Sequence, residues 1–205
     1  MISFDSIKKS FAAMSYFDFI RKIIFKLIRP FSFNLFRKIR GIVFFKSKHI
    51  ILGKNVTLQG QIFSIKLGKD INVYNNCIFE LGSKANLDIG NKVIFSYGCI
   101  INVNKFLKIG DCVQIGEYTS IRDTTHDYND YGKPMMENKD VSDSILIGNN
   151  VWIGKNCLIM PGAIIEDGVV IGANSIVKGI LKANKIYAGN PIGEITSRQE
   201  FLSAK

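Results

Sequence analysis

The sequence predicts an all-β protein whose strands wind into a parallel coil of hexapeptide repeats, with one loop ejected from the coil and a short helical arm in front of it. Isoleucine recurs every sixth residue from Ile147 to Ile171, and the next such place is Val177. Mostly small residues fill the fifth place of these hexads: Val151, Cys157, Ala163, Val169 and Ser175. A six-residue period fits neither a 3.6-residue helix nor a hairpin sheet, but it fits a coil whose sides are each one hexad long.

Residues 1–50 are predicted to form a basic, Phe-rich, amphipathic helical arm. Apolar residues recur at intervals of three to four between residues 4 and 28, and Pro30 ends or kinks this helix before a second helical piece over 33–43. Residues 1–46 hold 10 Lys and Arg against Asp5 and Asp18, so they carry 10 − 2 = +8 of the chain's net charge of +10, and they hold 10 of its 15 Phe. The excess charge therefore belongs to one segment.

The arm has two compatible interpretations, which the sequence leaves open. It packs on its own domain or a neighbouring subunit, or it lies on an anionic membrane surface with Phe inserted and Lys and Arg at the headgroups. No stretch approaches the ~20 apolar residues of a spanning helix, and no signal-peptide pattern is present. We therefore expect a cytoplasmic protein, with peripheral contact of residues 1–46 on the inner face of the plasma membrane under the second interpretation. Nucleic acid is not an expected partner, because so many Phe suit lipid better.

The coil is predicted over residues 51–182, followed by a C-terminal cap segment over 183–205. Pairs of an aliphatic residue and Gly mark the starts of its rungs, for example Ile109-Gly110, Ile147-Gly148, Ile153-Gly154 and Ile171-Gly172. Three hexads make an 18-residue turn, which is the interval from Gly154 to Gly172, whereas the interval from Gly110 to Gly148 is 38 residues, or 18 plus 20. That turn is predicted to eject a polar loop over residues 126–144, and long loops on rigid scaffolds are commonly functional.

The four Cys are interpreted as reduced residues of a cytoplasmic protein. Cys77, Cys99 and Cys157 take the small fifth place of a hexad, which should point into the coil, and Cys112 lies off that place. No CxxC pair suggests a metal site, and we expect no metal.

The phrases "IGNNVWIG" at 147–154 and "AGNP" at 188–191, together with the hexads and the ejected loop, resemble those of the hexapeptide-repeat acyltransferases. The resemblance covers roughly residues 51–195 and is greatest to the maltose and galactoside O-acetyltransferases and to relatives that acetylate capsule and lipopolysaccharide sugars. It implies a left-handed parallel β-helix, a homotrimer, and acetyl-CoA as the acyl donor. It also implies an active site between two subunits, near the ejected loop.

His126, in "TTHDY", is the candidate general base. It matches the His that opens the loop in that family, and an imidazole with a pKa near ~6.5 can take the proton of a sugar hydroxyl as the hydroxyl attacks a thioester. Trp152, at an outward-facing place, is grouped with His126 as catalytic, lining the acetyl-CoA channel or the acceptor site; packing against a neighbouring subunit is its alternative. His49 is interpreted as structural.

Substrate-binding roles are assigned to Asn102, Asp127 and Tyr128. Asp127 either orients the imidazole, binds the acceptor or is a solvated loop carboxylate. Arg122 is either a corner residue or a ligand of a CoA phosphate, and Asp123 is a weaker candidate than Asp127. For acetyl-CoA, the resemblance implies contacts from Gly154, Lys155, Ala173, Tyr187 and Gly189. Lys178 is also assigned to it, although the order Lys178-Gly179 departs from the family pattern, and Lys182 and Lys185 are candidates for the CoA phosphates because the family's Arg residues are absent here.

These observations predict an acetyl-CoA-dependent O-acetyltransferase that acts on a sugar hydroxyl of a bacterial surface polysaccharide or its precursor by direct transfer. An acetyltransferase for small sugars or for streptogramin- or chloramphenicol-type compounds is the enzymatic alternative. A passive solenoid scaffold is the non-enzymatic one, and the sparse Thr of the hexads argues against the ice-binding form of it. A γ-class carbonic anhydrase shares the coil but needs three His on zinc, and this chain has only two.

Overall fold

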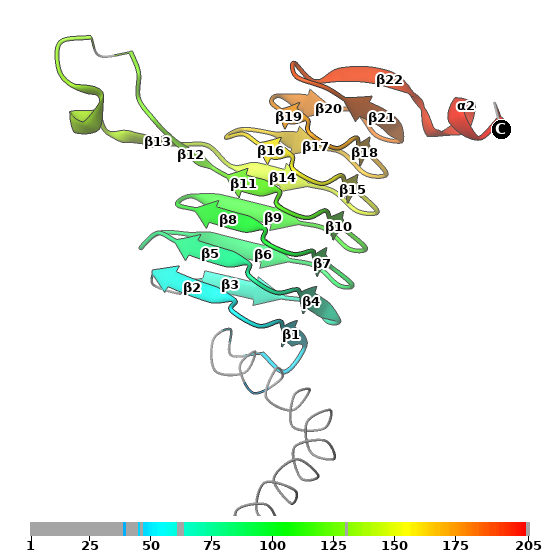
Figure 1. Cartoon of the computed structure of the whole chain (residues 1–205), viewed down its shortest axis with the longest axis horizontal. Helices are drawn as coiled ribbons and strands as arrows, with labels where there is room; N and C mark the ends of the chain where they lie inside the picture. The colour runs from blue at the N-terminus through cyan, green and yellow to red at the C-terminus, as the bar shows by residue number, and fades with distance from the viewer. Residues whose placement is uncertain (1–38, 40–44, 46, 61–63, 130, 204–205) are drawn as a thin grey trace, which may run out of the picture.

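The computed structural model describes residues 39, 45, 47–60, 64–129 and 131–203. Within them the chain forms a three-sided parallel solenoid of stacked coils (Figure 1). Face A contains β1 (Ile50–Leu52), β4 (Ile71–Val73), β7 (Ile94–Phe95), β10 (Gln114–Ile115), β15 (Trp152–Ile153), β18 (Val170–Ile171), β21 (Lys185–Ala188) and β22 (Gly193–Ser197). Face B contains β2 (Thr57–Gly60), β5 (Ile78–Leu81), β8 (Ile100–Val103), β11 (Ser120–Arg122), β16 (Leu158–Ile159) and β19 (Ile176–Val177). Face C contains β3 (Ser64–Leu67), β6 (Asn86–Ile89), β9 (Phe106–Ile109), β14 (Ile145–Ile147), β17 (Ile164–Ile165) and β20 (Ile180–Leu181).

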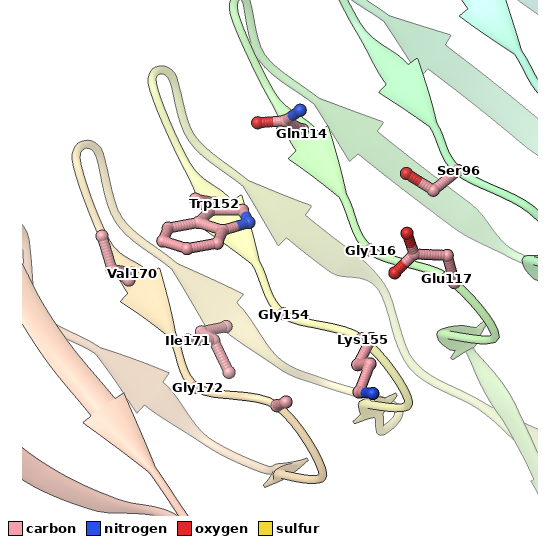
Figure 2. A pocket seen from close by; sticks show the side chains of 11 residues that line it. Ser96, Gln114, Gly116, Glu117, Trp152, Gly154, Lys155, Val170, Ile171 and Gly172 are labelled. Atoms are coloured by element: carbon pink, nitrogen blue, oxygen red, sulfur yellow. The ribbon is translucent and has the colours of Figure 1, made fainter.

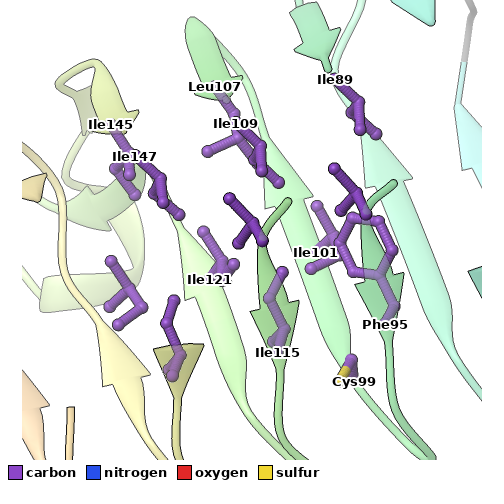
Figure 3. Close-up of a cluster of buried hydrophobic side chains, with 14 of the residues drawn as sticks. Ile89, Phe95, Cys99, Ile101, Leu107, Ile109, Ile115, Ile121, Ile145 and Ile147 are labelled. Atoms are coloured by element: carbon purple, nitrogen blue, oxygen red, sulfur yellow. The ribbon is translucent and has the colours of Figure 1, made fainter. Parts of the chain in front are cut away.

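From β1 to β21, apart from the ejected loop, the chain visits the faces in the order A, B, C, so each strand pairs in parallel with the strand of the same face one coil away. The all-β parallel coil predicted from the hexads is therefore confirmed. The repeated Ile column points inward, as expected: Ile147, Ile153, Ile159, Ile165 and Ile171 are all at most 2% exposed. Figure 3 shows such side chains from successive coils meeting inside the solenoid. Burying each of them contributes about 1.5–3 kcal/mol, which is what drives short strands with few hydrogen bonds to stack.

The small fifth place of the hexad holds a column of thiols and hydroxyls inside the corner between faces A and B. The thiols of Cys77, Cys99 and Cys157 are buried, and each donates to a backbone carbonyl one coil above: Ser96 at 3.0 Å, Gly116 at 3.3 Å and Gly172 at 3.3 Å respectively. Thr119 continues the column with its hydroxyl bonded to the Gly154 carbonyl at 3.0 Å. All four Cys are free thiols, and burial raises the pKa of the Cys157 thiol.

Asn and Asp side chains tie the coils together at the corner between faces C and A. Asn91, Asp111, Asn149 and Asp167 lie above one another, and a side-chain oxygen of each accepts the backbone N–H of a residue in the coil below, at 2.6–2.9 Å. The backbone N–H donors of Asn91 and Asn149 hold the pKa values of Asp111 and Asp167 below their ordinary range. This ladder satisfies corner amides that strand pairing does not reach.

The loop leaves the coil between face B and face C. It pairs with itself as an antiparallel ribbon of β12 (Thr124–His126) and β13 (Asp140–Ser142), and it carries the short 3-10 helix η1 (Met135–Glu137). The ribbon projects well beyond the side of the solenoid (Figure 1). The departure begins at Thr124, two residues before the predicted start of the loop.

At the C-terminal end β22 turns back antiparallel to β21 and is followed by the helix α2 (Arg198–Ser203), which lies to the side of the stacked coils (Figure 1). At the other end the predicted arm lies almost wholly outside the described residues. Of its residues, Phe45 is described and buried, with its ring edge-on to Phe79 at 5.4 Å between centroids. No helix among the described residues is long and apolar enough to cross a membrane.

Candidate functional site

A pocket of about 190 Å³ lies where the ribbon leaves the coil. The last residues of face B, the ribbon and the preceding corner all contribute to it, and its lining is polar: Asn102, Asn104, Arg122, Thr124, Thr125, His126 and Asp140. Of the residues predicted to act on a substrate, His126 and Asn102 are therefore brought together.

His126 is held by a partner from the opposite strand of the ribbon. Residues 126 and 140 are paired across the ribbon, and the His126 Nδ1 lies 2.9 Å from Asp140 Oδ1. A carboxylate only accepts, so Nδ1 carries the proton and Nε2 is left as the basic nitrogen. No protein partner of Nε2 is found in the described part of the chain. The pair has the geometry of a positioned general base, with the imidazole side chain 67% exposed.

Asp140, rather than Asp127, orients the imidazole. The Asp127 carboxylate accepts bonds from the backbone N–H and the side-chain amide of Asn129, at 3.0 and 2.9 Å, so it shapes a local turn. Tyr128 is exposed on the ribbon and does not line the pocket. The substrate-binding roles of Asp127 and Tyr128 remain predictions.

Asp123 anchors the ribbon to the coil. It is fully buried, and its carboxylate accepts the backbone N–H groups of Asn104, Lys105 and Phe106 at 2.8–3.0 Å, together with the hydroxyl of Thr124 at 2.8 Å. Four donors on one buried carboxylate satisfy its oxygens and fix the base of the loop. Its role is therefore structural.

A second recess, a groove of about 420 Å³, runs along face A and the corner that follows it. It is lined by Ser96, Gln114, Gly116, Glu117, Trp152, Gly154, Lys155, Val170, Ile171, Gly172 and Ala173 (Figure 2). Trp152, as expected, points outward and is 56% exposed. The predicted set Trp152, Gly154, Lys155 and Ala173 is thus gathered in one place.

Glycine gives this groove its shape. Gly116, Gly154 and Gly172 occupy the same place on successive coils, and a Cβ on Gly116 or Gly154 would lie 2.5–2.6 Å from backbone atoms of the coil above. The missing Cβ atoms therefore let successive coils stack closely at this corner. Towards the N-terminal coils this column continues with Ser96 and then Tyr74, whose ring meets that of Tyr97 at 5.1 Å.

The remaining residues predicted to bind acetyl-CoA lie outside this groove. Lys178 is exposed beyond it, and Lys185 is paired with Glu194 at 2.7 Å, which raises the Lys185 pKa. Tyr187 is buried at 6% exposure, and its hydroxyl accepts the backbone N–H of Lys182 at 2.9 Å. Gly189 donates its N–H to the Ser175 hydroxyl at 3.0 Å. The roles of these residues stay predictions. Because the Tyr187 ring is buried, a ligand near it would contact the backbone of Tyr187 and not its ring.

The two recesses have no lining residue in common. Within one chain, the structure therefore separates the candidate base His126 from Trp152 and the glycine column. Among the described residues, no group of three or more His, Cys, Asp or Glu is arranged to hold a metal ion.

The repeats and the fold are shared with known proteins. Residues 144–179 match the family described as bacterial transferase hexapeptide (six repeats). The probable acetyltransferase Rv3034c of Mycobacterium tuberculosis is 25% identical over 181 residues, which are 87% of this chain and 56% of that protein. The chain thus spans little more than half the length of this relative.

Two solved structures show the same fold. AntD, an N-acyltransferase from Bacillus cereus in complex with dTDP and 3-hydroxybutyryl-CoA, has a TM-score of 0.63 and 21% identity over 77% of this chain and 88% of that one. A mutant of perosamine N-acetyltransferase from Caulobacter crescentus, in complex with CoA and GDP-perosamine, has a TM-score of 0.51 and 14% identity over 72% of this chain and 57% of that one. The resemblance to the hexapeptide-repeat acyltransferases, first noted from residues 147–154 and 188–191, is confirmed.

Proposed function

We propose that this hexapeptide-repeat acyltransferase transfers an acetyl group from acetyl-CoA to a sugar hydroxyl of a bacterial surface polysaccharide, such as a capsule or lipopolysaccharide, or of its precursor. The observation that carries this proposal is the His126–Asp140 pair at 2.9 Å in a polar pocket. A hydroxyl is a poor nucleophile at neutral pH, so it needs a base held in place. A neutral amine is a much better nucleophile than a hydroxyl and needs such a base less, which favours O-acetylation.

The transfer is direct. Nε2 of His126 takes the proton of the sugar hydroxyl while the oxygen attacks the carbonyl carbon of the thioester. The C–S bond then breaks, the sulfur leaves as the thiol of CoA after receiving the proton from the imidazolium, and the ester is formed. Asp140 keeps Nδ1 protonated and stabilises the transient imidazolium. No group on the enzyme is acylated at any stage.

The glycine groove suits the donor. A pantetheine arm is narrow and carries amide groups, and the groove of about 420 Å³ beside Trp152 and the glycine corner has room for it. Because His126 and this groove do not meet within one chain, we propose that the site forms between two copies in a homotrimer. His126 of one copy then faces the groove of the next.

The acceptor class is supported by two solved structures, and the place of action is supported by the basic N-terminal segment. AntD and the perosamine enzyme were solved with nucleotide or nucleotide-sugar ligands, which supports a saccharide acceptor here. An arm with 10 Lys and Arg and 10 Phe in residues 1–46 would hold a cytoplasmic enzyme at the inner face of the plasma membrane, where glycan precursors are assembled. Co-sedimentation with anionic liposomes should be lost on deleting residues 1–46; equal binding by both chains would refute this placement.

Release of CoA thiol with a panel of acceptors tests the function. The panel contains capsule oligosaccharides, simple glycosides, amino sugars, chloramphenicol and a streptogramin, each assayed with the wild type, H126A and the surface control K108Q. Turnover on a hydroxyl-bearing glycan that is lost only in H126A is expected. Turnover on the drugs or amino sugars alone, or acceptor-dependent turnover that survives in H126A, would overturn the proposal.

A further inference from the structure

The carboxylates around the His126 pocket all have partners. Asp140 is bonded to His126, and the buried Asp123 accepts four hydrogen bonds. One coil below Asn102, the Glu80 carboxylate accepts the Asn102 amide N–H at 2.7 Å. The oxygens of these carboxylates are therefore engaged by donors within the protein.

Arg122 is different. It lines the same pocket at the end of β11, directly above Asn102 in the face-B register, and it is exposed. Among the described residues Arg122 has no hydrogen bond and no ion pair, so its exposed guanidinium is free to pair with a ligand in this pocket. The Asn102 amide N–H donates to Glu80 one coil below, so Asn102 lies between that carboxylate and Arg122 in the face-B register.

The donor does not explain this free charge. In acetyl-CoA the phosphates are separated from the thioester by the whole pantetheine arm. A donor whose thioester lies at His126 cannot also place its phosphates in the small pocket that His126 shares with Arg122. An anionic group that pairs with Arg122 can therefore arrive with the other substrate.

We propose that the acceptor is an anionic saccharide, whose carboxylate or phosphate binds Arg122 while a neighbouring hydroxyl reaches Nε2 of His126. This inference rests on the proposed function and narrows its substrate class. A planar guanidinium can bind either oxyanion through two parallel hydrogen bonds. The Oδ1 of Asn102 and the hydroxyl of Thr125 line the same pocket and can bond the sugar hydroxyls.

Matched acceptors test the selectivity. Methyl glucoside is compared with methyl glucuronide and glucose 1-phosphate, and the same three are prepared in the galacto series, in order to separate a carboxylate from a phosphate. We expect kcat/KM of the wild type to favour one anionic acceptor by about 10- to 100-fold, the range of a charged hydrogen bond. This preference should fall towards unity in R122Q, recover in part in R122K, and persist in K108Q. A neutral preference in the wild type, or an anionic preference that R122Q retains, would overturn the inference.

Binding without turnover separates this inference from the proposed function. The chain has only two His, so the imidazole signals in an NMR spectrum are His126 and His49, and H126N identifies the former. Titration with methyl glucuronide or inorganic phosphate should shift the His126 signal saturably in the wild type, at least tenfold more weakly in R122Q, and leave His49 unmoved. If the shift appears while no acceptor is turned over, the acyl transfer fails but the anion site stands. If no anion shifts His126, or R122Q binds equally well, the anion site fails whatever the turnover.

Discussion

The glycine groove on face A and the His126 pocket are parts of one solenoid, but they are built in opposite ways. The groove uses equivalent places on successive coils, so the hexapeptide period that makes the fold also makes the groove. The pocket exists only where the period is interrupted, because His126 and Asp140 come from the ejected ribbon. The regular part of the molecule therefore forms the groove, and the interruption contributes the candidate base His126 and its partner Asp140.

The largest expected effect tests whether the chemistry lies in the interruption. H126A should lower kcat by about a thousandfold, since a positioned general base contributes about 10²–10⁴. H49A is the matched control, because His49 lies before the coil and lines neither recess. Release of CoA thiol measures both variants. An H49A loss as large as that of H126A would remove the distinction between the two regions.

The next effect tests whether the two regions work in different copies. A173F places a ring in the groove and should raise the KM for acetyl-CoA by more than about tenfold, as bulk replaces ligand surface. Trimers reassembled from a mixture of H126A and A173F chains should regain activity, because up to about one quarter of the sites would combine an intact His126 with an intact groove. Unmixed A173F and H126A, denatured and refolded alone, are the controls. Mixtures that stay inactive would place the whole site within one chain.

A smaller effect tests the orientation of the base. D140N keeps an oxygen that can accept from Nδ1 but removes the charge that stabilises the imidazolium, so kcat should fall by about 10- to 100-fold while the KM for acetyl-CoA is unchanged. D140A should be worse than D140N. D127N, whose carboxylate bonds only Asn129 among the described residues, should lose less activity than D140N. The reverse ranking would return the orienting role to Asp127.

The smallest effect concerns the regular part alone. The pKa values of Asp111 and Asp167 are lowered in the folded protein, so their contribution to stability is present above the unfolded-state pKa and is lost as the pH falls through the folded-state values. D111N and D167N keep the side-chain oxygen that accepts the corner amide, as Asn91 and Asn149 already do. At pH 7 these variants should melt about 1–2 °C below the wild type, and the difference should vanish as the pH falls through the folded-state pKa values of the two carboxyl groups. A difference that grows in acid would contradict the ladder.

The strands and the inward-facing residues of the repeats could be predicted from the sequence. For the ejected ribbon, the sequence predicted its position and His126 but not the partner of His126. The hexads predicted the inward Ile column and the buried thiols. Gly154, Lys155 and Ala173 were predicted by their positions relative to Trp152, and all of them line the groove on face A. Asp140 was missed because no period links it to His126. The signal that could have found it is symmetry: residue 126 lies three residues after Asp123, and residue 140 lies three before Asp143, where the loop rejoins the coil.

Two residues show that a place in the repeat can determine the surroundings of a side chain more than its chemical type does. Tyr187 pairs with the inward Ile171 on face A, so its ring belongs to the core. Asp123 has the composition of a site residue, yet it anchors a corner. Burial and partners in neighbouring coils decide both cases, and neither can be read from a single hexad.

The number of stacked coils also determines the distance between the pocket and the N-terminal end of the solenoid. Neighbouring strands of a sheet are about 4.8 Å apart, so each coil inserted or removed between β1 and β11 would move the pocket by one such step without changing its composition. Residues 69–90 are one such coil, bounded by the equivalent Gly68 and Gly90. The distance between the pocket and the N-terminal end of the solenoid is therefore adjustable in steps of one coil. Adding a coil does not require any change in the residues of the pocket.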